Sequence, residues 1–270
     1  MTPLHFLPAG YFERKTLLNH SKVEWTDFNC DYYVGCRHNC KYCYARKLQR
    51  LDESEWIRVH VCKNALELAV REIRTIPKGS RIMVSSMTDP YQYIEQDEQV
   101  TRMLIPILAA RPDITVILIT KSDLVKRDFG LIAEFPNVHL CMTITSFKDL
   151  PDLEPDSPGN AARIKCLREA NAYGIYTIAS IEPWIPKVTN PLQVLQSIWP
   201  FVKEVFVGSY NWHYRRGSEP EKDAITEYRA ILPHVTKFLE DHMIKYTIKK
   251  ELRKLVSPQK AEGELIINDF

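Results

Sequence analysis

The stretch Gly35-Cys36-Arg37-His38-Asn39-Cys40-Lys41-Tyr42-Cys43-Tyr44 carries the most specific chemical signal in the chain. Its cysteines, Cys36, Cys40 and Cys43, follow the spacing C-x3-C-x2-C. Iron–sulfur clusters are usually held by four cysteine thiolates, so a set of three can hold three irons of a 4Fe–4S cluster and leave the fourth iron open to a molecule that reacts. Structural zinc is the competing interpretation, because zinc usually takes four ligands and His38 lies between two of the cysteines.

The composition is that of an ordinary globular chain. It has 270 residues, of which 45% are hydrophobic and 26% charged, and this length suits one large α/β domain or two small ones. A net charge of +2 argues against a broad nucleic-acid-binding surface, although a local basic patch is enough for binding. The seven cysteines are an odd number, which fits a reducing compartment better than a disulfide framework.

The chain also lacks the sequence features of membrane and secreted proteins. No apolar run reaches the roughly 18 residues that cross a membrane. The first residues do not combine a basic region with an apolar stretch, as a signal peptide does. We therefore expect a cytoplasmic protein without a membrane partner.

Short β-branched apolar runs alternate with amphipathic helical stretches from the cysteines almost to the end of the chain. Such alternation predicts parallel strands joined by crossover helices. The expected strands are 29–34, 81–85, 114–120, 138–145, 175–182 and 204–209. The expected helices are 44–51, 64–73, 98–110, 122–134, 161–173 and 191–199. Six such units predict an α/β fold with a partial (β/α)6 barrel.

The whole chain is expected to form a single domain, with a core of about 29–210 and a C-terminal helical extension over 211–270. The last part, 219–270, is interpreted as one long helix, a short strand near 246–248 and a tail. The Pro- and Asp-rich segment 151–159 is typical of a surface loop. Four basic residues are expected on a solvated helix face: Lys249, Lys250, Arg253 and Lys254.

The strand expected at 138–145 shows which side chains face the inside of the barrel. Alternation places two sets on opposite faces, the first being Val138, Leu140, Met142 and Ile144 and the second His139, Cys141, Thr143 and Thr145. The apolar set suits packing under helices, and the second set suits the barrel interior. Because sites in β/α barrels lie at the C-terminal ends of the strands, Thr143 and Thr145 are well placed for an active site.

Two further motifs follow strands directly. The segment Ser85-Ser86-Met87-Thr88-Asp89-Pro90-Tyr91-Gln92 follows one strand, and Ile119-Thr120-Lys121-Ser122 closes the next. Together with the cysteine stretch, these segments resemble the spore photoproduct lyase-like branch of the radical S-adenosylmethionine (SAM) superfamily. The resemblance covers most of 29–182 and implies a partial radical SAM barrel.

The resemblance implies the cofactors and the residues that bind them. SAM would chelate the open iron of a 4Fe–4S cluster, and one electron from a flavodoxin- or ferredoxin-type donor would cleave it to a 5′-deoxyadenosyl radical that abstracts hydrogen. Thr88, Lys121 and Thr143 would contact SAM, and Tyr42 would offer its backbone to the adenine. The cation of Lys121 suits the methionine carboxylate. The alternatives are a solvated charge for Lys121 and a turn or helix cap for 88–90.

One position departs from the family pattern. Spore photoproduct lyases carry a hydrogen-donating cysteine in the segment before the Thr-Asp pair, and here the matching place is Ser86. A hydroxyl O–H bond is too strong to return a hydrogen atom easily to a carbon radical. Cys141 is a candidate substitute, and the alternative for it is a buried small apolar residue. Cys30, Cys62 and Cys166 are expected to be ordinary buried thiols.

The remaining candidate residues lie near the strand ends. Glu182 suits the SAM ribose, the SAM amino group or a substrate amine, with a structural salt bridge as the alternative. Tyr91 and the segment after the sixth strand are candidates for substrate binding. The mixture of aromatic residues and arginines in that segment suits stacking on a base and neutralising phosphate. Its candidates are Tyr210, Trp212, His213 and Arg215.

Three functions follow from these features. The first is hydrogen abstraction from a nucleobase, a thymine derivative in DNA or a nucleotide, leading either to modification or isomerisation of a hypermodified thymidine or to lyase-type repair. A base in a duplex would then be flipped out. The second keeps the radical chemistry on a peptide side chain or a small metabolite. The third is a non-catalytic zinc or iron–sulfur interaction module.

Overall fold

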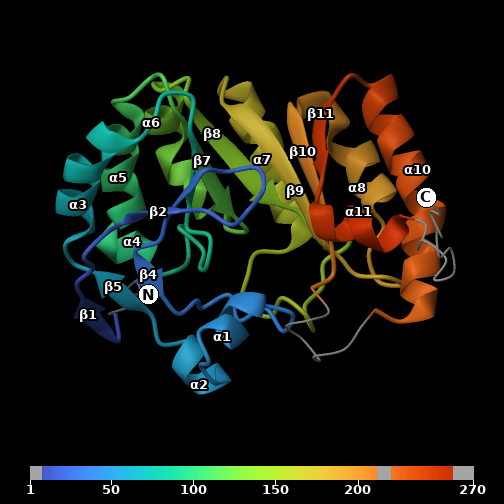
Figure 1. Ribbon diagram of the computed structural model, residues 1–270, viewed down its shortest axis with the longest axis horizontal. Coiled ribbons are helices and arrows are strands. Elements are labelled where there is room, and N and C mark those ends of the chain that lie inside the picture. Colours follow the sequence, from blue (N-terminus) through green and yellow to red (C-terminus); the bar gives the residue numbers. More distant parts are fainter. Residues whose placement is uncertain (1–7, 212–219, 258–270) are drawn as a thin grey trace, which may run out of the picture.

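The computed structural model describes residues 8–211 and 220–257. Its largest element is an eight-stranded sheet, seen in Figure 1. In the order in which they lie side by side, its strands are β11 (Lys245–Ile248), β10 (Glu204–Ser209), β9 (Tyr176–Trp184), β8 (Val138–Thr143), β7 (Thr115–Thr120), β6 (Arg81–Val84), β3 (Phe28–Cys30) and β2 (Leu18–His20). Neighbouring strands are parallel except for the pair β2 and β3.

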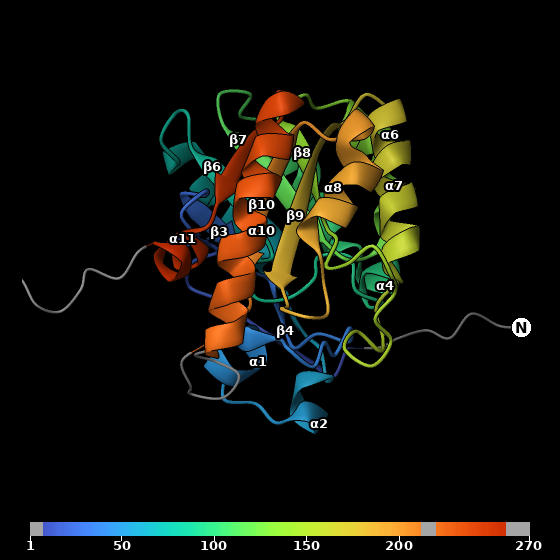
Figure 2. The same cartoon turned by 90° about the vertical axis from the view of Figure 1, so that its right-hand side faces the viewer.

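Helices cover the outer face of this sheet (Figures 1 and 2). They are α3 (Ala65–Glu72), α5 (Val100–Ala109), α6 (Phe129–Ala133), α7 (Asn160–Ala172), α8 (Pro191–Ile198) and α10 (Lys222–Asp241). Four further helices are α1 (Tyr44–Leu48), α2 (Glu53–Trp56), α4 (Glu95–Glu98) and α11 (Lys250–Val256). Short 3-10 helices span Ile73–Thr75, Asp123–Asp128 and Trp199–Phe201. The α/β fold with parallel strands that the sequence predicts is therefore confirmed.

A second, small sheet and two short helices lie at one end of the molecule. The small sheet has the order β1 (Gly10–Phe12), β5 (His60–Cys62) and β4 (Tyr33–Val34). Helices α1 and α2 lie below the large sheet in Figure 1, and the β9 arrow in Figure 2 points towards them. The segment that contains the cysteines therefore lies at the C-terminal ends of the parallel strands.

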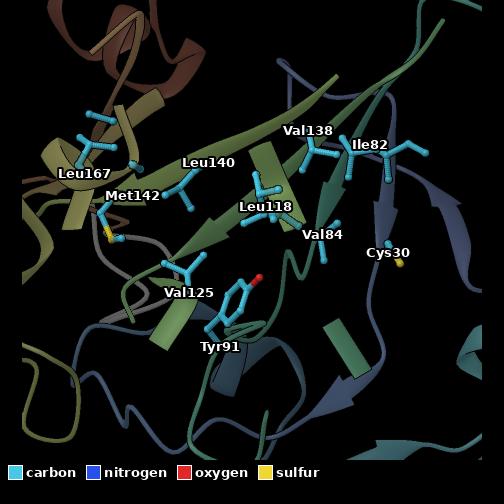
Figure 3. Close-up of a cluster of buried hydrophobic side chains, with 14 of the residues drawn as sticks. Cys30, Ile82, Val84, Tyr91, Leu118, Val125, Val138, Leu140, Met142 and Leu167 are labelled. Atoms are coloured by element: carbon cyan, nitrogen blue, oxygen red, sulfur yellow. The ribbon is translucent and has the colours of Figure 1, made fainter. Parts of the chain in front are cut away.

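The alternation expected for β8 is confirmed, because its two faces enter different clusters. Val138, Leu140 and Met142 join the large core between the sheet and the helices, shown in Figure 3. On the inner face, Cys141 belongs to a separate small cluster that fills the barrel interior. This interior plug consists of Trp25, Met83, Ile117, Cys141, Ile178 and Phe206. The barrel interior beneath the pocket is thus a packed apolar core, and the pocket lies at the C-terminal ends of the strands.

Four details differ from the sequence predictions. The stretch 29–34 divides between β3 and β4, which belong to different sheets. The stretch 122–134 begins as the 3-10 helix and becomes α6 only at Phe129, because the Ser122 hydroxyl accepts from Leu124 N–H and favours a tight turn. Strand β11, expected as a short strand within the C-terminal extension, pairs with β10 and so adds a strand to the large sheet beyond the six expected. The expected surface loop 151–159 carries a side chain, Glu154, that is only 4% exposed.

None of the described helices is both long and apolar enough to cross a membrane.

Candidate active site

The cysteine loop is held in place by its contact with the end of α2. Gly35 has a φ of +86°, and a Cβ there would lie 2.7 Å from the carbonyl oxygen of Trp56. The backbone N–H of Cys36 donates to the same oxygen at 2.8 Å. Only glycine combines this left-handed conformation with such a close approach. The first cysteine is therefore positioned by backbone contacts.

The three cysteines of this loop line one pocket at the C-terminal ends of the strands. Cys36 and Cys40 are each 8% exposed, and Cys43 is half-buried. The pocket has about 1050 Å³ of space, part of it open to solvent. Burial raises the pKa of Cys40 to about 12, and the nearby charge of Lys121 partly opposes that rise. A bound metal keeps such a thiol deprotonated.

A cluster and a single metal ion place different demands on the three thiols. Within 8–211 and 220–257, no group of three or more His, Cys, Asp or Glu side chains is placed to hold one metal ion. A tetrahedral zinc site needs its ligands to converge on one point. In a cubane cluster each thiolate binds its own iron, so the sulfur atoms need not converge. Cys36, Cys40 and Cys43 line one pocket, which is compatible with three thiolates that each bind a different iron.

The loop after β6 supplies the next part of the pocket. The Asp89 carboxylate accepts from the Thr120 hydroxyl at 2.6 Å and from the Lys121 backbone N–H at 2.7 Å. It also lies 3.4 Å from His38 Nδ1. Burial by itself raises the pKa of Asp89, but His38 and these hydrogen bonds outweigh it and bring the pKa to about 2. Asp89 therefore joins the cysteine loop to the ends of β6 and β7.

Lys121 and Thr143 reach the same pocket from β7 and β8. The Lys121 ammonium lies 5.7 Å from the centre of the Tyr42 ring, within the usual range of a cation–π contact. Thr143 is 5% exposed and ends β8. The three polar residues expected to contact SAM, which include Thr88, thus share one pocket with the cysteines.

Several buried polar atoms along this pocket have no partner among the residues described. They are Ser85 Oγ, Thr88 Oγ1, Trp25 Nε1 and Trp56 Nε1. Each unsatisfied buried group costs about 1–3 kcal/mol. A ligand that fills the pocket and offers oxygen, nitrogen or sulfur acceptors would remove this cost. The lining therefore fits an inorganic sulfide cluster together with a polar organic cofactor.

A buried network behind Tyr42 was missed by the sequence analysis. The Tyr42 hydroxyl donates to Glu154, which also accepts from the Thr145 hydroxyl at 2.7 Å and from Arg163 at 2.7 Å. Arg163 is fully buried. Burial raises the pKa of Glu154, but the charges of Arg163 and Lys121 and these hydrogen bonds hold it below its usual value. The composition of 151–159 gave no sign that Glu154 lies inside.

Glu182 lines the pocket and pairs with Lys249, which the sequence predicted on a solvated helix face. Lys249 Nζ lies 2.5 Å from Glu182 Oε2, and the Lys249 side chain is 17% exposed. Lys249 also lines the pocket, so its expected place on a solvated helix face is wrong. Lys250, Arg253 and Lys254 are exposed as expected. The pairing of β11 with β10 carries Lys249 to the pocket, which composition alone does not reveal.

The candidate hydrogen donors occupy different environments. Ser86 lines the pocket, and its hydroxyl donates to Asp31 at 2.7 Å. Cys141 is fully buried in the interior plug and is not part of the pocket lining. Burial raises the pKa of its thiol well above the usual value. Among the described residues, the only thiols that line the pocket are those of the cysteine loop.

The expected substrate-binding aromatic residues do not reach the pocket where they are described. Tyr91 is fully buried in the core outside the sheet, as Figure 3 shows, because Asp89 turns the chain by accepting its backbone N–H at 2.8 Å. Tyr210 is 5% exposed, and only its neighbours Ser209 and Asn211 line the pocket. Three candidates lie outside the described residues: Trp212, His213 and Arg215.

Comparisons with known proteins agree with this geometry. A family model described as the radical SAM superfamily matches residues 31–190. An uncharacterised protein of Methanocaldococcus jannaschii is 30% identical over 217 residues, 77% of this chain and 82% of its own. An uncharacterised protein of Acidianus two-tailed virus is 23% identical over 190 residues, 65% of this chain and 62% of its own.

Solved structures show the same fold. A mutant of spore photoproduct lyase with dinucleoside spore photoproduct aligns with a TM-score of 0.69 at 13% identity, over 88% of this chain and 80% of that one. Streptococcus suis SuiB bound to S-adenosylmethionine aligns with a TM-score of 0.51 at 12% identity, over 93% of this chain and 52% of that one. From the family match over more than half its length, the chain belongs to the radical SAM superfamily, whose enzymes use a 4Fe–4S cluster and S-adenosylmethionine.

Proposed function

We propose that the chain abstracts a hydrogen atom from a nucleobase-type substrate, a thymine derivative in a nucleotide or in DNA. The observation that carries the proposal is one pocket at the strand ends that combines the three thiols, Lys121, Thr88 and Thr143. When bound, the cluster and SAM together supply a carbon radical that takes the hydrogen atom. The protein residues position both cofactors and keep water away.

Each pocket residue has a distinct role in this proposal. Cys36, Cys40 and Cys43 hold the three ligated irons. The Lys121 ammonium pairs with the methionine carboxylate of SAM, and the hydroxyls of Thr88 and Thr143 donate hydrogen bonds to SAM. Two further cofactor contacts are the Tyr42 backbone with the adenine and Glu182 with the ribose or amino group. A flavodoxin- or ferredoxin-type protein delivers the electron.

A flat aromatic substrate suits the lining of the pocket. The half-buried Tyr42 and Tyr44 contribute aromatic surface to it. Base–aromatic stacking contributes about 1–3 kcal/mol per base. The similar lyase structure with a dinucleoside spore photoproduct supports a base as substrate. In the sequence, the segment 210–217 contains aromatic and basic residues of the kind that bind nucleotides.

The surroundings of the pocket favour modification or isomerisation over lyase-type repair. Ser86 cannot easily return a hydrogen atom, and its O–H already donates to Asp31. Cys141 lies in the plug, away from the lining. An isomerisation can recover its hydrogen atom from the methyl group of 5′-deoxyadenosine, so it needs no protein thiol. We therefore assign Cys141 to packing.

Anaerobic reconstitution with iron and sulfide, followed by SAM and dithionite, tests this function. Thymidine derivatives deuterated at the substituent carbon should transfer deuterium to 5′-deoxyadenosine. Replacing Cys36, Cys40 or Cys43 by Ala should abolish SAM cleavage, whereas Cys141→Ala should retain it. If no deuterium from any thymidine derivative reaches 5′-deoxyadenosine, the nucleobase assignment is wrong.

A peptide substrate is the second candidate. It is favoured by the similarity to SuiB bound to its precursor peptide SuiA, with a TM-score of 0.52 at 10% identity, over 92% of this chain and 50% of that one. Mass spectrometry of DNA and of the proteome, with and without active protein, separates the two classes. A mass change confined to a protein would favour the peptide.

A further inference from the structure

Glu182 and Lys249 approach each other from strands on either side of β10. Between them lies Gly208, where a Cβ would be 2.7 Å from Glu182 Cδ and 2.9 Å from Lys249 Cδ. Both distances are shorter than van der Waals contact. The missing side chain of Gly208 therefore provides the space in which the ammonium and the carboxylate meet at 2.5 Å.

This ion pair faces the pocket. Both side chains line it and remain partly exposed, Glu182 at 32% and Lys249 at 17%. The backbone N–H of Lys249 donates to the Val207 carbonyl at 2.9 Å, which fixes where its side chain begins. A lysine ammonium has three N–H donors, and a single bond to Glu182 leaves two to be shared with a ligand.

Other hydrogen-bond donors lie at or just after the ends of the neighbouring strands and line the pocket that Lys249 lines. Ser180 of β9, Ser209 of β10 and Asn211 line the same pocket. A compact cation beside hydroxyl and amide donors is a composition that binds phosphate oxygens. The second cation of the lining, Lys121, follows β7, which β8 and β9 separate from β10. The two lysines therefore serve different regions of the pocket.

We propose that Lys249, with Ser180 and Ser209, binds the phosphate of the nucleotide that carries the reacting base. The proposal rests on the proposed function and adds the substrate group recognised at the ends of β9, β10 and β11. Glu182 then keeps the Lys249 ammonium oriented over Gly208 before the phosphate arrives. A free nucleotide and a nucleotide within a DNA strand present the same phosphate chemistry.

Calorimetric binding tests this subsite without turnover. The reconstituted protein with SAM, but without a reductant, is titrated with thymidine, thymidine 5′-monophosphate and a short thymidine oligonucleotide. Wild type should bind the monophosphate at least about tenfold more tightly than thymidine, because a hydrogen-bonded charge contributes more than a neutral contact. Lys249→Ala and Lys249→Gln should remove this preference and keep the affinity for thymidine. The control Lys254→Ala, on the exposed side of α11, should behave as wild type.

The outcomes are distinguishable. Preference for the oligonucleotide over the monophosphate, lost in Lys249→Ala, identifies the phosphate of a DNA strand, and the reverse preference identifies a free nucleotide. The proposal is overturned if wild type binds none of these ligands or shows no phosphate preference. It is also overturned if Lys249→Ala keeps the preference for the phosphate. A third contrary result is an equal loss of affinity for thymidine and its monophosphate together with a lower Tm, because the ion pair would then only stabilise the packing of the C-terminal segment.

Binding and radical chemistry fail independently in these tests. A Lys249-dependent phosphate preference without deuterium transfer from any thymidine derivative would leave the subsite standing and reject the proposed reaction. Deuterium transfer from thymidine derivatives without any effect of Lys249 on phosphate binding would support the proposed reaction and reject the phosphate subsite.

Discussion

Gly35 and Gly79 adopt the same kind of backbone but differ in their surroundings. Their φ angles are +86° and +82°. A Cβ at Gly35 would meet two carbonyl oxygens, 2.7 Å away on Trp56 and 2.8 Å away on Arg58, whereas a Cβ at Gly79 would meet nothing within 4 Å. Backbone atoms cannot yield as the end of a flexible side chain can. The cysteine loop must therefore move if Gly35 gains a side chain.

Gly35→Ala should reduce iron binding, and Gly79→Ala should not. Both substitutions strain a left-handed residue, which costs about 1–3 kcal/mol. Only Gly35→Ala also displaces Cys36, whose N–H donates to the Trp56 carbonyl. Iron content after anaerobic reconstitution, together with the urea midpoint of each variant, measures the two effects. Equal iron content in the two variants would contradict this account of the loop.

The segment 151–159 and the cysteine loop form one unit. The backbone N–H of Lys41 donates to the Leu153 carbonyl at 2.9 Å. Beside this contact, Glu154 bonds the Tyr42 hydroxyl and the fully buried Arg163 of α7. A buried charge that loses its partner is costly, because neither water nor another group replaces the missing interaction. The loop thus ties the cysteines to the outer helices.

Glu154→Gln should destabilise the fold by about 3–5 kcal/mol at pH 7, because Arg163 loses its buried counter-charge. The folded pKa of Glu154 lies below its ordinary value, so its contribution is complete above that ordinary value and is lost as pH falls through the folded pKa. Urea unfolding of wild type and variant at a series of pH values from 7 downward measures the difference, which should shrink in acid. Glu53→Gln is the control, because Glu53 pairs with Lys41 near the same loop but is 51% exposed. A pH-independent difference would contradict this assignment.

The elements differ in how far the sequence could predict them. The alternation in β8 was readable because period two needs no knowledge of distant residues. The cysteine spacing was readable because its residues lie within one loop. The positions of Glu154 and Lys249 could not be predicted, since their surroundings depend on partners that the fold brings together. In both cases the composition predicted a solvent-exposed side chain. Tertiary contacts instead bury Glu154 and place Lys249 at the pocket.

Over the whole molecule, the C-terminal part completes the fold that holds the site. The Tyr228 hydroxyl of α10 donates to the Trp184 carbonyl at 2.9 Å and accepts from the Tyr210 N–H at 3.1 Å. Val235 and Leu239 of α10 and Leu252 of α11 are fully buried in the large core. The backbone N–H of Lys250 also donates to Glu24 at 2.7 Å, which joins α11 to the segment that carries Trp25.

A chain that ends at Tyr210 lacks α10, β11 and α11. It should therefore fail to fold cooperatively, because the apolar core beneath these elements is exposed. A chain that ends at Ser257 keeps all of the described elements and is the matched control. Thermal unfolding followed by circular dichroism should give one transition for the full chain and for the control, and none for the short chain. A soluble short chain with its own cooperative transition would show that 211–270 is a separate unit. Since Lys249 reaches the pocket only through β11, such a chain would also lack the phosphate preference while its cysteine loop stayed intact.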